Sequence, residues 1–407
     1  MTDLIKADLK TVRQLEGAPT SFKLAGFTLL NLSRGRLDVI LPDGRTLRFE
    51  GPEPGAHAVI IAKDLRFTRR VLSQGDIGFA EAYMADEFDT PDLTAILEFF
   101  SQNFEAAGRL AVGGWISRAM NKVRHILHRN SKSGSKKNIL AHYDLGNQFY
   151  ERWLDTTMTY SSATFEAPGQ PLQDAQLSKY RRIAEGIALK PDAHVLEIGS
   201  GWGGFAEVAA KEFGAKVTSV TISNAQHEFA SKRMFEAGLA ERVDIQLRDY
   251  RDIDGKFDGV ASIEMFEAVG EEYWPGYFGK VSDALEDGGR AAFQIITIDD
   301  DLFDGYRKRA DFIQHFIFPG GMLPSVRRLN EEAGAAGLKL EDSHMFGASY
   351  AQTLAEWSER FHAAWDDIKA LGFDDRFRRL WHFYLAYCEA GFNSGRIDVG
   401  HFVMAKQ

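Results

Sequence analysis

The sequence of 407 residues has one cysteine, Cys388, and no apolar run that approaches the length of a membrane span. A single cysteine excludes an internal disulfide and a cysteine-based zinc cluster, which favours a reducing compartment. The opening residues, MTDLIKADLK, lack the apolar core of a signal peptide. Basic residues are outnumbered, 48 against 58 acidic ones, which argues against broad nucleic-acid binding. We therefore expect a cytoplasmic protein whose contact with a membrane is peripheral.

Positive charge is concentrated in one segment. Between Phe104 and Asn138 the chain has eight Lys and Arg residues and one Glu, and the segment ends in the linker-like run SKSGSKKN. Apolar residues recur within it at helical spacing, as in a helix that lies in a membrane interface, where Lys122, Arg124 and Arg129 would meet anionic lipid. The alternative is an interdomain helix with a solvated basic face. We predict three parts: a small domain over 1–103, this basic amphipathic linker over 104–138, and a catalytic domain over 139–407.

The first hundred residues show no spacing typical of a catalytic site. Residues 21–51 predict strands with turns at 33–35 and 42–44, whereas DIGFAEAYMADEF and DLTAILEFF predict helices. The prediction is a small α+β domain that contacts lipid or a second copy of the chain. No heptad supports a homodimer, so the oligomeric state stays open.

Strands and helices alternate after the linker. Short apolar segments such as HVLEI and KVTSVT are separated by amphipathic helical segments, which predicts a mostly parallel sheet covered on both faces. The last two strands, in LKLEDSHMF and RIDVGHFVMAKQ, are expected to form an antiparallel pair at one edge. The predicted class is therefore α/β and Rossmann-like, and no group of residues has the spacing of metal ligands.

A glycine-rich loop follows the first of these strands and opens a helix. Gly199, Gly201 and Gly203 allow a tight turn and let a ligand approach the backbone, next to Ser200. The next strand ends without the acidic residue that a dinucleotide ribose requires. Glu197 would bring nothing to a pyrophosphate, but its carboxylate suits the ammonium and sulfonium groups of S-adenosylmethionine (SAM). We predict a SAM site; a turn that only packs the helix on the strand is the alternative.

Eight short motifs then occur in a characteristic order. They are HYDLGN (142–147), MTYSS (158–162), EIGSGWGG (197–204), TISNAQ (221–226), RDYRD (248–252), MFEAVG (265–270), FIFPGGMLPS (316–325) and YCEAGF (387–392). In this order they resemble the cyclopropane-fatty-acid synthase family of SAM-dependent methyltransferases. The resemblance implies a class I SAM methyltransferase domain, and as substrate a cis double bond in the acyl chain of an unsaturated membrane phospholipid.

The resemblance also implies which residues hold SAM. The corresponding positions are Tyr160 and Ser161 at the methionine portion, Thr221 through Gln226 near the ribose, and Tyr250 with Arg251 near the adenine. Cys388 corresponds to a cysteine often designated catalytic. The chemistry does not require a thiol, and a small buried hydrophobe is the alternative role for Cys388.

The active-site positions depart from the family pattern. The best-known bacterial members are thought to use a bound bicarbonate as base, held by Cys, Glu, His and Tyr. This chain keeps the Glu (Glu267) and the Tyr (Tyr350), but has Ser162 and Gln294 where the Cys and His are expected. Glu264 stands where those members have a small residue. We expect Glu264 to replace bicarbonate as the base; the alternative is that it holds SAM or a backbone amide.

The chemistry leaves the product open. Methyl transfer from a sulfonium to an alkene leaves a carbocation, which needs a dry site with aromatic faces and a carboxylate. Proton loss from the new methyl group closes a cyclopropane, whereas loss from a neighbouring carbon gives a methylene or methyl-branched chain. Two further hypotheses are a small-molecule N- or O-methyltransferase on the same fold and a lipid-binding module with an inactive methyltransferase domain.

Overall fold

The computed structural model describes residues 4–103 and 145–407, and its contacts divide the chain into two compact units. The described parts of the first unit are residues 4–103, Arg309–Ile317 and Lys369–Ser394. Those of the second unit are residues 145–308, Phe318–Ile368 and Gly395–Gln407. The predicted basic linker, with Lys122, Arg124 and Arg129, lies outside the described residues. Within the described ranges, no helix has both the length and the hydropathy that crossing a bilayer requires.

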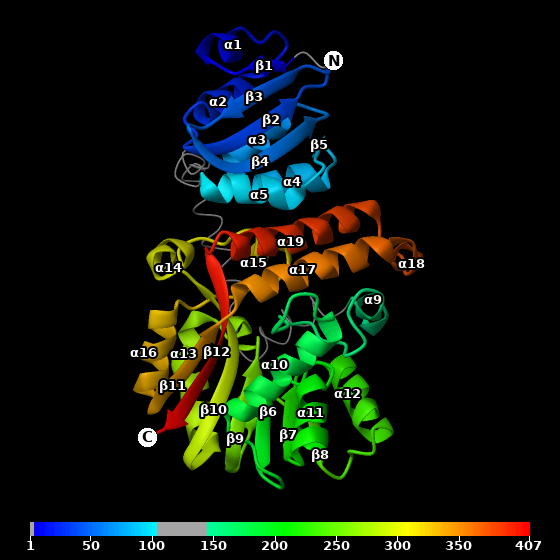
Figure 1. The fold of residues 1–407 in the computed structure, drawn as a ribbon, viewed down its shortest axis with the longest axis vertical. Helices are drawn as coiled ribbons and strands as arrows, with labels where there is room; N and C mark the ends of the chain where they lie inside the picture. Colours follow the sequence, from blue (N-terminus) through cyan, green and yellow to red (C-terminus); the bar gives the residue numbers. More distant parts are fainter. Residues whose placement is uncertain (1–3, 104–144) are drawn as a thin grey trace. The chain divides into compact units, whose positions relative to one another are not determined.

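The first unit is built on a five-stranded mixed sheet with the order β1-β3-β2-β4-β5. Its strands are β1 (Leu4–Lys6), β2 (Arg34–Ile40), β3 (Thr46–Glu50), β4 (Glu53–Ala62) and β5 (Phe88–Asp89). Its helices are α1 (Leu9–Gln14), α2 (Thr20–Leu29), α3 (Phe67–Gln74), α4 (Asp76–Met84), α5 (Leu93–Gln102), α15 (Phe312–Phe316) and α19 (Asp375–Asn393). The predicted small α+β domain is therefore confirmed (Figure 1).

One element of this unit was predicted wrongly. Residues 20–29 form helix α2 rather than a strand, because the buried residues Phe22, Ala25 and Gly26 recur three and four positions apart and so share one helix face. Gly26 lets α2 approach α1 closely: a Cβ at this position would lie 2.9 Å from Cγ1 of Val12. The predicted turn before β3 is present, with Gly44 at φ 87°.

Two helices from late in the chain belong to the first unit. Helix α19 packs against α4 and α5, and α15 packs against α4. The rings of Phe312 and Phe383 have centroids 4.7 Å apart, and Phe383 lies 6.1 Å from Phe79 of α4. The predicted catalytic domain differs from the observed division here, because these aromatic side chains are buried among residues of the first unit.

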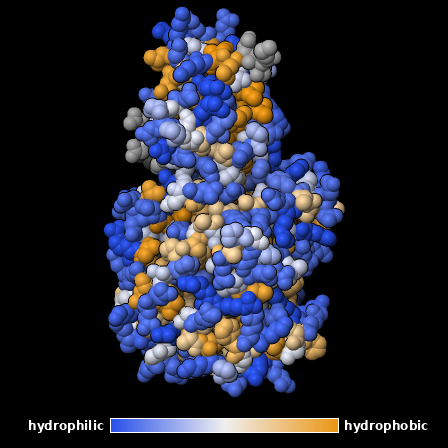
Figure 2. All heavy atoms as spheres, viewed as in Figure 1, coloured by the Kyte–Doolittle hydropathy of each residue, from blue (hydrophilic) through white to orange (hydrophobic). Residues whose placement is uncertain are grey.

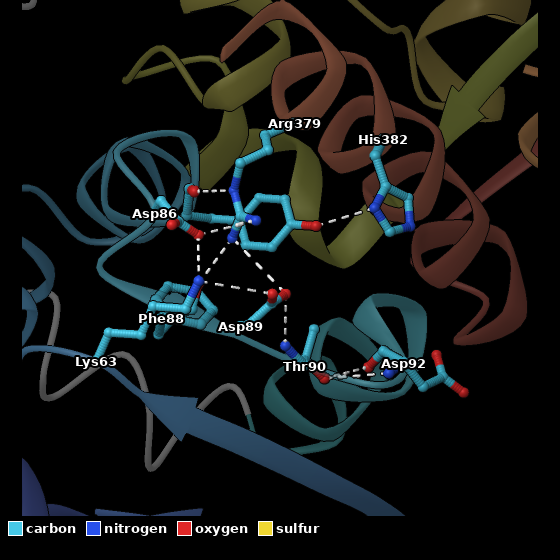
Figure 3. Close-up of polar contacts among 9 residues, drawn as sticks. Lys63, Asp86, Phe88, Asp89, Thr90, Asp92, Arg379 and His382 are labelled. Carbon is cyan, nitrogen blue, oxygen red and sulfur yellow. Dashed lines mark hydrogen bonds and ion pairs between the residues drawn. The ribbon is translucent and has the colours of Figure 1, made fainter. Parts of the chain in front are cut away.

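Arg379 of α19 is the polar centre of the same packing (Figure 3). It donates to the carbonyl oxygen of Phe88 at 2.7 Å, and its guanidinium lies 3.9 Å from the centroid of the Tyr83 ring. It also forms an ion pair with Asp86 at 3.1 Å. These contacts bind α19 to the turn between α4 and β5.

The second unit contains a seven-stranded sheet with the order β11-β12-β10-β9-β6-β7-β8. Its strands are β6 (His194–Ile198), β7 (Lys216–Thr221), β8 (Val243–Leu247), β9 (Phe257–Ile263), β10 (Leu285–Ile298), β11 (Leu338–Met345) and β12 (Ile397–Lys406). Strands β8, β7, β6, β9 and β10 are parallel, whereas β12 runs antiparallel to both β10 and β11. The mostly parallel sheet and its antiparallel edge are both as predicted.

Helices of the second unit cover both faces of this sheet. The helices of the unit are α9 (Asn147–Glu151), α10 (Leu172–Gly186), α11 (Gly204–Phe213), α12 (Asn224–Glu236), α13 (Trp274–Ala284), α14 (Asp300–Tyr306), α16 (Val326–Ala335), α17 (Gly347–Ala363) and α18 (Trp365–Ala370), with short 3₁₀ turns η1 (Tyr250–Asp252), η2 (Phe266–Ala268) and η3 (Glu271–Tyr273). One core joins α10, α11 and α12 to the sheet, and another joins α13 and α16 to its opposite face. Because β6, β7, β8, β9 and β10 are parallel, the loops that follow β6, β7, β8 and β9 meet at one edge of the sheet.

Candidate active site

The glycine loop connects β6 to α11 in the predicted way. Gly199 and Gly203 have φ values of 98° and 86°, in the region that favours glycine. The amide nitrogens of Gly199 and Ser200 both donate to the carbonyl oxygen of Val220, at 3.0 Å each, which holds the loop against the end of β7. Gly203 then forms the N-cap of α11. The loop is therefore a tight turn at the carboxyl edge of the sheet, where open parallel sheets bind their ligands.

Glu197 lies on β6 immediately before this loop and is buried. The Ser219 hydroxyl lies 2.5 Å from its Oε2 and 2.7 Å from the Ser200 hydroxyl. Burial raises the pKa of Glu197 to about 8, so its charge is poorly stabilised by the protein alone. A buried acid beside a glycine turn fits a cationic ligand, and the ammonium of SAM meets this requirement where a phosphate would not.

Aromatic side chains form a cluster that includes Trp202 of the loop. The Tyr160 ring lies 5.3 Å from both Tyr150 and Trp357, and Tyr150 lies 5.0 Å from Trp202 of the glycine loop. Trp202 also donates its indole N–H to Oδ1 of Asn147 at 2.9 Å. The structure thus brings together residues from three of the motifs, and their ring faces are suited to a sulfonium or a carbocation.

The residues predicted near the ribose and adenine lie at or just beyond the ends of β7 and β8. Thr221 donates to Oε1 of Gln226 at 3.0 Å, which fixes both side chains at the start of α12. Tyr250 and Arg251 lie in η1, where the Arg251 guanidinium is held by Asp249 at 2.8 and 2.6 Å. All four predicted residues therefore lie at the same sheet edge as the glycine loop.

Glu264 is the centre of a convergent group of hydrogen bonds. Its Oε1 accepts from the Ser162 backbone N–H at 2.8 Å and from Nε2 of Gln294 at 2.7 Å, and its Oε2 accepts from the Tyr350 hydroxyl at 2.7 Å. Ser162 and Gln294 are fully buried, and Tyr350 is 6% exposed. The structure thus brings together four residues that the sequence analysis assigned to the base and its surroundings.

The backbone at Glu264 is unusual. Its φ is 48°, a left-handed conformation that costs a residue with a side chain about 1–3 kcal/mol and is concentrated at functional sites. The amide of Glu264 donates to the carbonyl oxygen of Gln294 at 2.8 Å, which continues the pairing of β9 with β10 by one residue. The strained turn directs the carboxylate toward Ser162 and Tyr350.

Glu267 occupies a second carboxylate position three residues later. Its Oε1 accepts from the Ile296 amide at 2.6 Å, whereas its buried Oε2 has no hydrogen-bond partner among the described residues. Burial, followed by repulsion from Glu264, raises the pKa of Glu267 to about 8. The carbonyl oxygen of Glu267 accepts from the Met322 amide at 2.8 Å, which connects it to the motif at 316–325. One carboxylate oxygen thus remains for a ligand.

Two residues of this site were not predicted from the sequence. Lys179 of α10 is fully buried, and its ammonium donates to the Ser161 hydroxyl at 2.6 Å. His401 of β12 is the cross-strand partner of Gln294, and its Nε2 lies 2.8 Å from the Gln294 amide oxygen. This contact orients the Gln294 amide so that its N–H group points to Glu264. A lysine on the apolar face of α10 is the signal that could have identified Lys179.

Cys388 is half-buried in α19, within the first unit, whereas Glu264 belongs to the second. The catalytic role of Cys388 therefore stays a prediction.

Residues 130–402 match the family described as mycolic acid cyclopropane synthetase. A tuberculostearic acid methyltransferase of Mycobacterium tuberculosis is 38% identical over 363 residues, which cover 87% of this chain and 84% of that protein. The cyclopropane-fatty-acyl-phospholipid synthase of Escherichia coli K12 is 35% identical over 360 residues, with coverage of 86% and 88%. A solved mycolic acid cyclopropane synthase complexed with SAH and CTAB has a TM-score of 0.63 and 29% identity, covering 67% of this chain and 98% of that one.

Proposed function

Because the chain belongs to the mycolic acid cyclopropane synthetase family of SAM-dependent methyltransferases, we propose that it alkylates the cis double bond of an unsaturated acyl chain in a membrane phospholipid and closes a cyclopropane. The observation that supports this activity most is the group formed by Glu264, Ser162, Gln294 and Tyr350. It provides a carboxylate, buried among polar partners that fix its orientation, beside the predicted SAM loop.

Bound SAM would supply the electrophilic methyl group, and the protein has three tasks around it. Glu197 holds the cationic cofactor, and the aromatic group around Tyr160 excludes water and stabilises the positive charge that develops on the acyl chain. The carboxylate of Glu264 then removes a proton from the transferred methyl group. The electron pair of that C–H bond closes the three-membered ring, and Glu264 becomes neutral.

The use of Glu264 as base explains the departures from the bicarbonate pattern. A carboxylate already occupies the position where Ser162, Gln294 and Tyr350 converge, so these side chains hold Glu264 where other members are thought to hold the ion. The alternative is that Glu264 only holds SAM or a backbone amide, and the hydrogen bond that it accepts from the Ser162 amide is of the second kind. The contacts from Tyr350 and Gln294 go beyond that role, and substitution of Glu264 distinguishes the two.

A second product is supported by one specific comparison. The relative with 38% identity over 363 residues is named for tuberculostearic acid, and it covers 87% of the chain. For this chain, the corresponding reaction shares the methyl transfer and differs in the carbon that loses the proton, which gives a methylene or methyl-branched chain. The position of Glu264 relative to the carbocation would decide between the two products.

The proposal includes peripheral binding to the cytoplasmic side of a membrane through the basic segment 104–138. The sequence pattern supports this part of the proposal. The segment has eight basic residues and one acidic residue, and its apolar residues recur at helical spacing. Flotation with anionic vesicles should show salt-sensitive binding that weakens in the triple variant Lys122→Glu, Arg124→Glu and Arg129→Glu. Vesicle binding that changes neither with salt nor in the triple variant would contradict this part of the proposal.

The experiment that tests the function is mass spectrometry of acyl methyl esters after incubation of the protein with SAM and monounsaturated phospholipid vesicles. A mass gain of one CH2 confirms alkylation of the acyl chain, and fragmentation distinguishes a ring from a branch or a methylene. Unchanged acyl chains, with methylation of an added amine or hydroxyl compound instead, would favour a small-molecule methyltransferase. Absence of SAM binding would favour an inactive lipid-binding module.

A further inference from the structure

A buried lysine lies next to the proposed base. Lys179 is 0% exposed on the inner face of α10, and its ammonium donates to the Ser161 hydroxyl and to Oε1 of Gln176, at 2.6 Å each. Burial of an ammonium is costly unless it is hydrogen-bonded and electrostatically compensated. Two neutral partners provide the hydrogen bonds, and the groups that favour the charged form of Lys179 are nearby acids.

One of those acids is Glu264. Lys179 and Glu264 are connected through two consecutive residues: Ser161 accepts the Lys179 hydrogen bond, and the Ser162 amide donates to Oε1 of Glu264 at 2.8 Å. Burial lowers the pKa of Lys179 and raises that of Glu264, and the charge of each group opposes the shift of the other. Of the effects that lower the pKa of Glu264, the charge of Lys179 is the largest.

The other titratable groups around this pair come from several elements. Facing Glu264 are the Tyr350 hydroxyl from α17, a hydrogen-bond donor, and the Glu267 carboxyl from η2, whose negative charge would oppose ionisation. Facing Lys179 are Asp155, the ring of Tyr180 at 4.7 Å, and His401 from β12. Burial lowers the pKa of His401 well below its ordinary value, so His401 is neutral near pH 7. Burial lowers the pKa of Lys179 to about 7, so it is the Lys179 ammonium, in its protonated form, that faces Glu264 as a cation.

We propose that Lys179 is a positioning residue that keeps Glu264 ionised and ready to accept a proton in a site from which water is excluded. This inference rests on the proposed function, in which Glu264 is the base. In that function Lys179 does not touch the substrate; it acts by making the carboxylate form of Glu264 favourable before the methyl transfer.

The test is the variant Lys179→Met, which removes the charge and keeps a chain of similar length. Without the cation, ionisation of Glu264 becomes less favourable, so the acid limb of the pH profile of kcat/KM should move to higher pH by about one unit or more. Turnover near neutral pH should fall about tenfold or more and recover at alkaline pH. Lys190→Met, at an exposed position, is the matched control with an unshifted profile.

A second variant and a spectroscopic measurement complete the test. Lys179→Gln, which retains a donor for Ser161, replaces Lys179→Met if that variant does not fold. Infrared difference spectra between each protein and its Glu264→Gln counterpart report the protonated carboxyl of Glu264 without any turnover. This carboxyl band should persist to higher pH in the Lys179 variant than in the wild type.

The outcomes separate this inference from the proposed function. In the Lys179 variant, the infrared carboxyl band of Glu264 and the pH profile of kcat/KM could both stay where they are in the wild type, with activity reduced equally at every pH. That result would assign Lys179 a purely structural role and overturn the inference. If Glu264→Gln itself retains turnover, the proposed base is wrong, while the infrared titration still shows whether Lys179 controls the ionisation of Glu264.

Discussion

The hydroxyl of Tyr350 donates to Oε2 of Glu264 at 2.7 Å, joining helix α17 to the strained residue that follows strand β9. On the other carboxylate oxygen, Gln294 and the Ser162 amide donate at 2.7 and 2.8 Å. The Tyr350 contact is therefore the one described hydrogen bond to Oε2, and it fixes the direction in which that oxygen faces. A base in this position has a defined orientation before any substrate binds, which is a condition for selecting one proton over its neighbours.

Substitution Tyr350→Phe tests the contribution of this hydrogen bond. The ring is kept, but a donor to a charged group is lost, which is worth about 1.5–3 kcal/mol. We expect kcat to fall roughly 10- to 100-fold, with the acid limb of its pH profile moved to higher pH because the Glu264 carboxylate loses stabilisation. SAM affinity, measured by calorimetry, should change little. Tyr83→Phe, in the first unit, is the control; equal losses in both variants would contradict a specific role for Tyr350.

Glu197 makes a prediction about the pH dependence of SAM binding. Burial raises its pKa to about 8, and the form that attracts a cationic ligand is the carboxylate. Near neutral pH, binding should therefore release a proton, and affinity should rise with pH until it passes the pKa of Glu197. Calorimetry in buffers of different ionisation enthalpy measures both effects.

The matched variants are Glu197→Gln and Glu267→Gln. The first should bind SAM about 10- to 100-fold more weakly at alkaline pH and show little pH dependence, since its side chain cannot ionise. The second also removes a carboxyl whose pKa is about 8, but it should leave the pH dependence of SAM affinity in place. An unchanged pH dependence in Glu197→Gln would show that this residue does not receive the cofactor's charge.

The first unit offers a prediction about stability. Arg379 donates to the backbone carbonyls of Tyr83 and Phe88, at 2.5 and 2.7 Å, and pairs with Asp86 at 3.1 Å. Arg379→Met removes these bonds and leaves two carbonyl oxygens without that donor, so the free energy of unfolding should fall by about 2–4 kcal/mol. Denaturant unfolding measures the change, with Arg376→Met at an exposed position as control. SAM affinity should persist, because the glycine loop belongs to the second unit; an Arg379→Met protein as stable as the control would contradict the argument.

The sequence predicted the sheet of the second unit well, and the reason is physical. Parallel strands covered on both faces are short apolar runs, and Gly199 and Gly203 identify the turn because their φ values of 98° and 86° favour glycine. The parallel order also places the ends of β6, β7, β8 and β9 at one edge, where Glu197, assigned from the loop, lies with Thr221 and Tyr250, assigned from the family resemblance. The resemblance to a known family identified Ser162 and Gln294, and both donate hydrogen bonds to Glu264.

Other features depend on long-range packing that a linear pattern does not specify. Lys179, Arg181 and Arg182 are close together in α10, and only the fold shows that Lys179 is buried while Arg181 pairs with Glu212 at half-exposed positions. Aromatic residues of α19 predict a buried face without naming its partner, which proved to be α4 and α5. Helix α2 was mistaken for a strand because Phe22 and its apolar neighbours suit either structure until their burial is known.

One measurement tests directly whether Glu264 is the base. Turnover of unsaturated phospholipid vesicles is compared for the wild type and Glu264→Gln, in buffer exhaustively depleted of bicarbonate and again after bicarbonate is added, with SAM binding measured for both proteins. We predict that the wild type keeps its activity without bicarbonate, and that Glu264→Gln still binds SAM but loses turnover by about 10²–10⁴-fold, the usual contribution of a general base. A wild-type enzyme that stops without bicarbonate and resumes when it is restored would contradict the account.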